Sequence, residues 1–309
     1  MIKYFLAIVT FLPFISISQD MDNYHWEDEL LSICSFSDTS EFCFVNPGRI
    51  QSEKWNELAQ PKFWQKIMRL SPDSCVINIG ATREIIAVMS LADWDKKSED
   101  EKDIYRDSIR AERGMAAEEK VFMTTGKNDF YHFNAVIPSI SKGIEVFNQN
   151  GVDPWYAQAI LMIESPGKLA KSNVGAYGPF QLMKAVAIKQ GLTVNGAIDE
   201  RKDFEKSAWA AGKLIKNICI PEAKRILNGH NLSYNENDLW FRLFVLHIYH
   251  AGSGNVSQVV NAIQPTQGGQ DLITQMWQTK AGRFGNASQN YSQLALASFL
   301  VLNEMLITL

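Results

Sequence analysis

The sequence predicts a mainly α-helical protein, in which a compact all-α domain over residues 134–309 follows a smaller α-rich region that also contains strands. Two observations predict this fold class. From about residue 134 onward, apolar residues recur at helical spacing, and Asp, Pro and Gly residues stand where helices should begin and end. Hydrophobic residues also make up 46% of the 309-residue chain, which is enough for a substantial core.

Residues 1–18 have the pattern of a secretory signal peptide. Lys3 supplies a positive charge, residues 4–17 form an apolar run, and a small-x-small cleavage site precedes Gln19. A membrane anchor is the alternative, but the run is shorter than the ~20 residues that cross a bilayer, and Pro13 interrupts it. We therefore predict a periplasmic or secreted protein with no stable membrane span after cleavage.

The N-terminal region, residues 19–133, shows no motif that points to a chemistry, and its role stays open. Residues 19–60 have the composition of a loosely organised lead-in. The elements expected after them are a helix over 63–70, a strand or buried turn over 75–79, a helix over 83–94, a solvated helix over 95–113 and a strand over 120–125. A partner-binding module is one possible role for this region.

The all-α domain shows clear helix boundaries. Asp153 is a suitable N-cap, Pro154 fits the first helical position, and Pro166 should end that helix at residue 165. Gly191 and Pro221 should end two later helices. The helices expected in this domain cover 137–147, 153–165, 181–190, 204–218, 239–249, 256–263 and 291–306. The segment 239–249 is apolar on nearly every face, which is typical of a helix buried in a core.

Composition restricts the partners and cofactors. The net charge is only −4, without a basic excess, so we predict no nucleic-acid partner, and no pattern indicates a particular protein partner. The cysteines fit no zinc spacing, and His247 and His250 have no evident third ligand, so we predict neither a metal nor a cofactor. Four tryptophans are expected in the core rather than as platforms for sugars: Trp155, Trp209, Trp240 and Trp277. A place in the cleft is the alternative for Trp277, which lies in a Gly-rich neighbourhood.

The chain has four cysteines, and an exported protein meets an oxidising environment. One arrangement pairs Cys34 with Cys43 in a local loop and Cys75 with Cys219 across the two halves of the chain. Free buried thiols are the alternative.

Glu164 is the main candidate for catalysis. It falls in the last turn of the helix expected over 153–165, beside apolar Ile160 and Leu161, and no Lys or Arg stands within three residues of it. Poor solvation and the negative end of the helix dipole should both raise its pKa. A carboxylic acid that keeps its proton near neutral pH can protonate a leaving oxygen. A solvated glutamate at the end of a surface helix is the alternative.

The segment after Glu164 contains residues that suit a sugar-binding loop. Gly175, Gly178 and Pro179 fix a tight backbone that a ligand can approach closely. Ser172 and Gln181 place a hydroxyl and an amide on either side of this bend, and such groups suit the hydroxyl and N-acetyl groups of a sugar. An ordinary loop followed by a helix is the alternative.

Three ordered motifs resemble the soluble lytic transglycosylase family. They are Glu-Ser at 164–165, Lys-Ser-x-Val-Gly-Ala-x-Gly-x-x-Gln at 171–181, and Tyr-x-Ala-Gly-x-Gly-Asn-Val at 249–256. The resemblance covers roughly residues 135–300, and it implies a lysozyme-like α-helical catalytic domain similar to goose-type lysozyme. It implies that Glu164 is the single catalytic acid and base.

The resemblance also implies binding roles. Ser172 would contact the N-acetyl group of the substrate, and Gln181 matches the glutamine of the family's Gly-Leu-Met-Gln motif. Tyr249 matches the tyrosine of an Ala-Tyr-Asn motif that hydrogen-bonds near the acid, and Tyr291 matches a later tyrosine that lines the cleft. His250 replaces the asparagine of that motif, where it can still hydrogen-bond and would titrate near neutral pH.

The loop sequence shows a further departure from the family pattern, and a later segment shows a further match to it. The glutamine motif is Gly-Pro-Phe-Gln here, at 178–181, and it follows Glu164 more closely than in many members. Asp199 and Arg201 resemble an Asp-x-Arg element with a structural role. These differences indicate a divergent member of the family.

The implied substrate is the glycan strand of peptidoglycan. Glu164 would protonate the bridging oxygen of the β-1,4 bond between N-acetylmuramic acid and N-acetylglucosamine, and would then accept the proton of the muramyl C6 hydroxyl as a 1,6-anhydro ring closes. A hydrolytic muramidase would need a second carboxylate to direct water, but residues 166–198 contain none. Asp199, Glu200 and Asp203 are expected to be capping and salt-bridge residues instead. The alternatives are a hydrolytic muramidase and a non-catalytic glycan-binding protein on the same fold.

Overall fold

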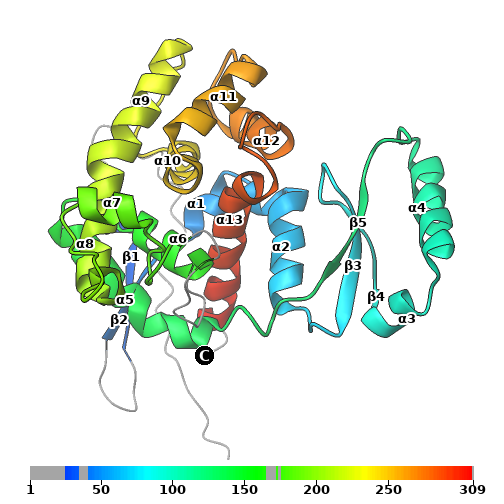
Figure 1. Cartoon of the computed structure of the whole chain (residues 1–309), viewed down its shortest axis with the longest axis horizontal. Helices are drawn as coiled ribbons and strands as arrows, with labels where there is room; N and C mark the ends of the chain where they lie inside the picture. Colours follow the sequence, from blue (N-terminus) through cyan, green and yellow to red (C-terminus); the bar gives the residue numbers. More distant parts are fainter. Residues whose placement is uncertain (1–24, 35–40, 165–171, 173–174, 308–309) are drawn as a thin grey trace, which may run out of the picture.

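A computed structural model describes residues 25–34, 41–164, 172 and 175–307. A large helical body carries a smaller antiparallel sheet with two helices of its own, at the right of Figure 1. The predicted fold class, mainly α with a smaller α+β N-terminal region, is confirmed. Within the described ranges, no helix has the length and apolar character needed to cross a bilayer. The predicted signal peptide, residues 1–18, lies outside them.

The helical body is built around α10 (Leu239–Ala251), whose residues from Leu239 to Ile248 are all buried, as the apolar pattern predicted. The helices that contact α10 include α9 (Ile220–Gly229), α11 (Ser253–Ile263), α12 (Gln270–Gln278) and α13 (Asn286–Ile307). A second layer contains α5 (Phe133–Gln149), α6 (Trp155–Glu164), α7 (Lys184–Lys189), the 3-10 turn η4 (Glu200–Lys202), α8 (Phe204–Leu214) and the π-helical turn η5 (Ile215–Cys219). Helix α6 packs against both α5 and α13, which places its C-terminal end in the middle of the body (Figure 1).

The N-terminal hairpin contributes to the same core. Strands β1 (Leu30–Cys34) and β2 (Glu41–Val45) pair antiparallel, and β2 packs on α5 and α6. Gln158 of α6 holds the end of β2, because its Oε1 accepts the N–H of Val45 at 2.8 Å. The hairpin was not predicted, since five-residue strands in a polar stretch carry little periodicity. It is followed by α1 (Gly48–Ser52), the 3-10 turn η3 (Trp55–Glu57) and α2 (Ala59–Arg69), which packs on α13.

A buried ionic cluster fixes the start of α6. The 3-10 turn η2 (Trp26–Glu29) brings Glu29 to Arg242, whose side chain is only 1% exposed. Arg242 contacts Glu29 and Asp153, each at 2.7 Å, and Asp153 Oδ1 accepts the N–H of Trp155 at 2.9 Å, as expected of an N-cap. Burial raises the pKa of Asp153 and the Arg242 guanidinium opposes this rise.

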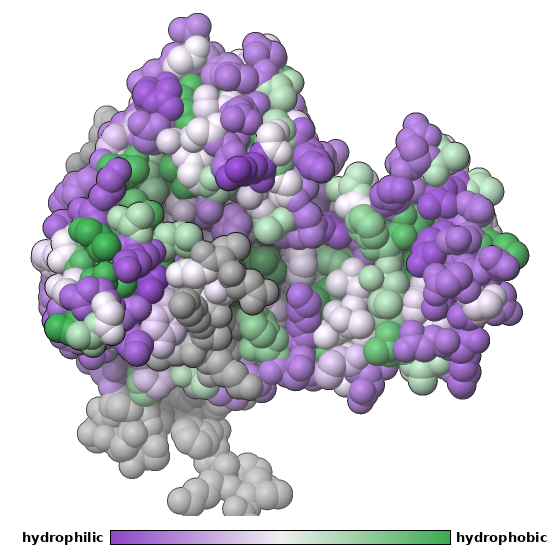
Figure 2. All heavy atoms as spheres, in the orientation of Figure 1, coloured by the Kyte–Doolittle hydropathy of each residue, from purple (hydrophilic) through white to green (hydrophobic). Residues whose placement is uncertain are grey.

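The smaller sheet has the order β4-β3-β5, with β3 (Ser74–Ile79) between β4 (Ile85–Ser90) and β5 (Val121–Thr125). Helices α3 (Leu91–Asp95) and α4 (Glu99–Arg113) cover one face, and hydrophilic residues dominate the surface around α4 in Figure 2. The helix predicted over 83–94 is therefore wrong for most of its length. Its β-branched residues instead form an edge strand paired with β3. A short apolar run fits the helical and the strand periodicity equally well, and here the pairing with β3 selects the strand.

Three other predictions need correction. Pro221 does not end a helix, because η5 widens the helix directly before it and the chain continues into α9. Helix α7 begins at Lys184 rather than at Gln181, whose φ of 46° is left-handed. The proposed disulfides are also wrong, since Cys43, Cys75 and Cys219 are free thiols, while the side chain of Cys34 is outside the described part.

Candidate active site

A cavity of about 220 Å³ lies at the C-terminal end of α6. Five of the six predicted site residues line it: Glu164, Ser172, Gln181, Tyr249 and His250. Pockets that hold a whole drug-sized ligand have volumes of ~300–1,000 Å³. This cavity is smaller, so it can admit one unit of a longer chain rather than a complete ligand.

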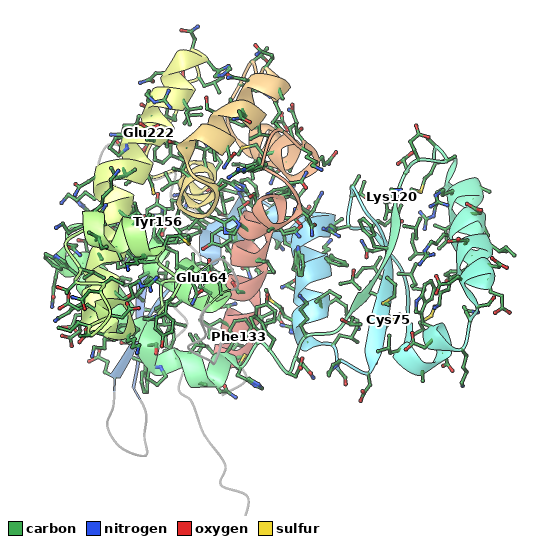
Figure 3. The ribbon with its side chains drawn as sticks, viewed as in Figure 1. Cys75, Lys120, Phe133, Tyr156, Glu164 and Glu222 are labelled. Atoms are coloured by element: carbon green, nitrogen blue, oxygen red, sulfur yellow. The ribbon has the colours of Figure 1, made fainter. Side chains whose placement is uncertain are left out.

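Glu164 is the last residue of α6, and Figure 3 shows it where α6 comes close to α13. Nine consecutive residues before it are buried, from Trp155 to Ile163, so the helix delivers the carboxyl from inside the core. Desolvation raises the pKa of Glu164 to about 7, and the nearby Tyr291 hydroxyl opposes this rise. No Lys or Arg is among the described residues that line the cavity. The predicted direction of the pKa shift and its main cause, poor solvation, therefore agree with the structure.

Two tyrosines and a histidine surround this carboxyl. The Tyr249 hydroxyl donates a hydrogen bond to the carbonyl of Phe180 at 2.6 Å, and so connects α10 to the glutamine loop. Tyr291 is almost completely buried, and its ring stacks on that of His250 with centroids 4.3 Å apart. The negative charge of Glu164 raises the pKa of both tyrosines further, after desolvation as the largest cause, which places both hydroxyls close to the carboxyl.

His250 differs from the expectation of a residue that titrates near neutral pH. The residue is exposed at the cavity, but the protein packed around its ring desolvates it and lowers its pKa. Its imidazole is therefore neutral at neutral pH. It can accept or donate one hydrogen bond there, as the asparagine of the family motif would.

The loop that carries Ser172 and Gln181 is a tight hairpin. Tyr177 and Leu182 form an antiparallel bridge, and the four residues between them make the turn. Gly178 has a φ of +84°, and a Cβ there would lie 1.8 Å from the carbonyl oxygen of Arg201, so only glycine fits. Phe180 anchors the turn in the core, where it stacks on Phe147.

Both polar side chains of the loop are held in place. The Ser172 hydroxyl accepts the N–H of Ala176 at 2.9 Å, which leaves its own proton free to be donated to a ligand. Gln181 has a left-handed backbone, and its Nε2 donates to the carbonyl of Gly178 at 2.9 Å. Such a conformation is costly for a residue other than glycine, and it points to a constraint imposed by the site.

Arg201 clamps this loop from behind. Its side chain is buried, and its Nη1 donates to the carbonyls of Gly175 at 2.9 Å and Leu182 at 3.0 Å. The other edge of the guanidinium binds both carboxylate oxygens of Asp199, at 2.9 and 2.7 Å. The structural role expected for Asp199 and Arg201 is therefore confirmed by these contacts.

The three carboxylates near the loop are all engaged in structure. Asp199 binds Arg201, Glu200 binds Lys206 at 2.6 Å and accepts the N–H of Thr193, and Asp203 caps α8. Glu164 is the one carboxylate among the described residues that line the cavity. The expectation that the other three are capping and salt-bridge residues is confirmed.

The apolar wall of the cavity was not predicted from the sequence. Met183, Val186 and Leu214 line it, and Met183 is exposed. The first two follow the glutamine motif directly, so their position could have indicated them. Leu214 comes from α8, and nothing local in the sequence connects it with the site. Within the described ranges, no group of His, Cys, Asp or Glu is arranged to hold a metal ion.

The fold and the cavity define a class: a mainly helical domain with a lone, desolvated carboxylic acid beside polar groups suited to a sugar. A comparison with known families supports this description of the domain. Residues 144–268 match the sequence model of the Transglycosylase SLT domain, which supports the family that the motifs predicted. The matched segment contains all the cavity residues named above, whereas Tyr291 follows it. No curated protein matches the chain. The family supports a lytic-transglycosylase type of action on peptidoglycan.

Proposed function

We propose that this protein is a lytic transglycosylase that cleaves the β-1,4 bond between N-acetylmuramic acid and N-acetylglucosamine, and that forms a 1,6-anhydromuramyl end. The observation that carries the proposal is Glu164, a desolvated carboxyl with a pKa of about 7 at the end of a buried helix. At neutral pH a large share of this group is protonated and ready to act as a general acid.

The reaction needs one group that works twice. Glu164 gives its proton to the bridging oxygen as the glycosidic bond breaks, and N-acetylglucosamine leaves as a free alcohol. The ionised carboxylate then accepts the proton of the muramyl C6 hydroxyl, whose oxygen bonds to C1. The acid is restored and no water is consumed, so no second carboxylate is required. Ser172 and Gln181 would orient the N-acetyl group, and Tyr249, His250 and Tyr291 would position the acid and the sugar.

Hydrolysis is the competing outcome, and the structure favours it less. An inverting hydrolase keeps its two carboxyl groups ~6.5–9.5 Å apart, with the second one activating water. Here the nearest alternatives, Asp199 and Glu200, are bound to cations outside the cavity lining. The signal-peptide pattern of residues 1–18 further supports action outside the cytoplasm, where peptidoglycan lies.

Product analysis tests the proposal. Purified sacculi are digested with the wild-type chain and with Glu164→Gln, and the soluble products are identified by mass spectrometry. We expect anhydromuramyl ends from the wild type and no products from the variant. Reducing muramic acid ends would establish a muramidase instead. Binding to sacculi without any release by the wild type would establish a non-catalytic glycan-binding protein.

A further inference from the structure

A second groove lies on the helices that also build the active-site cavity. It has a volume of about 730 Å³ and is lined by residues of α5, the segment directly after α7, η4 and α8. No described residue lines both sites, but Leu214 of α8 faces the cavity, whereas Lys213 of α8 faces the groove. Val186 of α7 also faces the cavity, and Gln190, directly after α7, faces the groove. The two sites therefore share α8 and are next to each other at the end of α7. Helices α5 and α8 pack together at the left of Figure 1.

Trp209 is the most unusual residue of this groove. It was expected in the core, as Trp155, Trp240 and Trp277 are, but it is 45% exposed. Among the described residues its indole N–H donates no hydrogen bond and its ring stacks on no other aromatic ring. Exposed large aromatic side chains inside a groove typically mark a binding surface, because an indole offers an apolar face together with a polar N–H.

The charges around Trp209 are neutralised within the groove. Lys142 binds Glu205 at 2.9 Å, Lys206 binds Glu200 at 2.6 Å, and Lys213 donates to a backbone carbonyl at 3.2 Å. Three lysines face three glutamates in the lining, so the groove has no formal net charge. Such a surface does not select for an anion or a cation, and it suits a neutral ligand rich in hydroxyl and amide groups.

Other parts of the lining fit the same ligand. Gln149 and Gln190 add amides, and the largely buried Val146 and Leu192 add apolar surface. The volume is within the ~300–1,000 Å³ of typical small-ligand sites, which is room for a short stretch of oligosaccharide. The flat apolar face of a pyranose ring matches the exposed face of an indole, and its hydroxyls match the amides.

We propose that the Trp209 groove is a second, non-catalytic binding site for the glycan strand of peptidoglycan. This proposal rests on the proposed function, because it takes the same polymer as its ligand. A strand held in the groove keeps the cavity, which α8 also lines, close to further strands of the insoluble network. Binding at two points raises the effective concentration of the second site without new contacts in the first.

The test separates binding from cleavage. In the Glu164→Gln background, which removes turnover, binding to purified sacculi is measured by co-sedimentation with and without Trp209→Ala. We expect about tenfold weaker binding or more on loss of the indole. Trp209→Phe should retain most of the affinity, because it keeps an aromatic face. Ile218→Ala removes a side chain that is similarly exposed, at 46%, and should change nothing.

The second arm uses the chain with Glu164 intact. Trp209→Ala should cleave short soluble glycan fragments at the wild-type rate, but should release products from sacculi more slowly. Unchanged binding to sacculi overturns the proposal, and so does an equal loss of activity on soluble and insoluble substrates, because Trp209 would then act through the catalytic site. Failure of the proposed function would give a different result. The wild type would then release no products from sacculi, and the effect of Trp209→Ala on binding to sacculi could still be measured.

Discussion

Two sets of carboxylates lie near the glutamine loop, and their surroundings give them opposite properties. Glu164 has no cation among the described residues of its cavity, and desolvation raises its pKa to about 7. Asp199 and Glu200 bind Arg201 and Lys206, and these hydrogen bonds lower the pKa of both. The side-chain type therefore does not decide the role. A cationic partner gives a carboxylate a structural role, whereas desolvation without such a partner lets it act as an acid.

The two sets also depend on each other. The Asp199–Arg201 pair holds the carbonyls of Gly175 and Leu182, and so fixes the loop that carries Ser172 and Gln181. That loop and Glu164 form the walls of one cavity. An acid whose substrate is misplaced by as little as ~1 Å can lose ~10²-fold in rate, so the structural carboxylate contributes to catalysis through position.

The largest expected effect follows from the acid itself. Glu164→Gln keeps the shape of the side chain and removes the proton that is transferred, so the release of products from sacculi should fall by at least ~10²–10⁴-fold. Turnover is measured by chromatography of the released fragments. Glu222→Gln is the matched control, because it removes a carboxylate that is paired with Arg225 outside the cavity lining, and it should keep full activity. Comparable losses of activity in both variants would show that Glu164 and the cation-paired carboxylates do not differ in role.

The next largest effect tests the clamp. Arg201→Ala leaves Asp199 without its partner and leaves two loop carbonyls unpaired, so we expect a loss of stability of ~3 kcal/mol, at the lower end for a pair that is only partly buried. Activity should fall by ~10²-fold as the loop loses its position. Stability is measured by chemical denaturation, and activity is measured under conditions where the variant is folded. Lys206→Ala breaks an exposed pair and should leave the stability nearly unchanged.

The sequence predicted the candidate acid, Glu164, more fully than it predicted the contacts that hold the neighbouring loop in place. Glu164 became a candidate because Asp153 and Pro154 mark the helix start and the apolar run indicates burial, and both signals are local. The loop after it and the resemblance to the family then favoured an acid over a solvated surface glutamate. Ser172 and Gln181 were found through the glycines between them. The contacts of Arg201 with the loop span up to 26 residues, and no local pattern encodes them.

Elsewhere the missing information concerned pairing and packing. The segment 83–94 contains β4 because it pairs with β3; a strand or buried turn was expected over 75–79, but its pairing with the following segment was not. Pro221 is tolerated because of a π-helical turn that no propensity describes. Trp209 was assigned to the core because large aromatic residues usually are buried, whereas the neighbouring helices leave it open to a groove.

A further prediction concerns stability and pH. The pKa of Glu164 is about 7 in the folded chain and 4.5 in its ordinary range, so the folded state prefers the protonated form. Wild-type stability is therefore complete below about pH 4.5 and decreases as the pH rises through 7. Glu164→Gln escapes this cost of roughly 3 kcal/mol, at ~1.36 kcal/mol for each pH unit of the shift. Denaturation curves should coincide at pH 4 and show a more stable variant at pH 8. A variant that is equally stable at pH 8 would mean that the wild-type carboxylate is solvated.

The smallest effect concerns the hydroxyl beside the acid. Because the Tyr291 hydroxyl lowers the pKa of Glu164, Tyr291→Phe should raise that pKa further. The wild-type rate should fall tenfold per pH unit above about pH 7, and this decline should begin at higher pH in the variant. The measurement is kcat/KM against pH on a soluble glycan fragment. The phenylalanine ring can still stack on His250, so a change confined to KM, with the pH profile in place, would assign Tyr291 to substrate binding rather than to control of the acid.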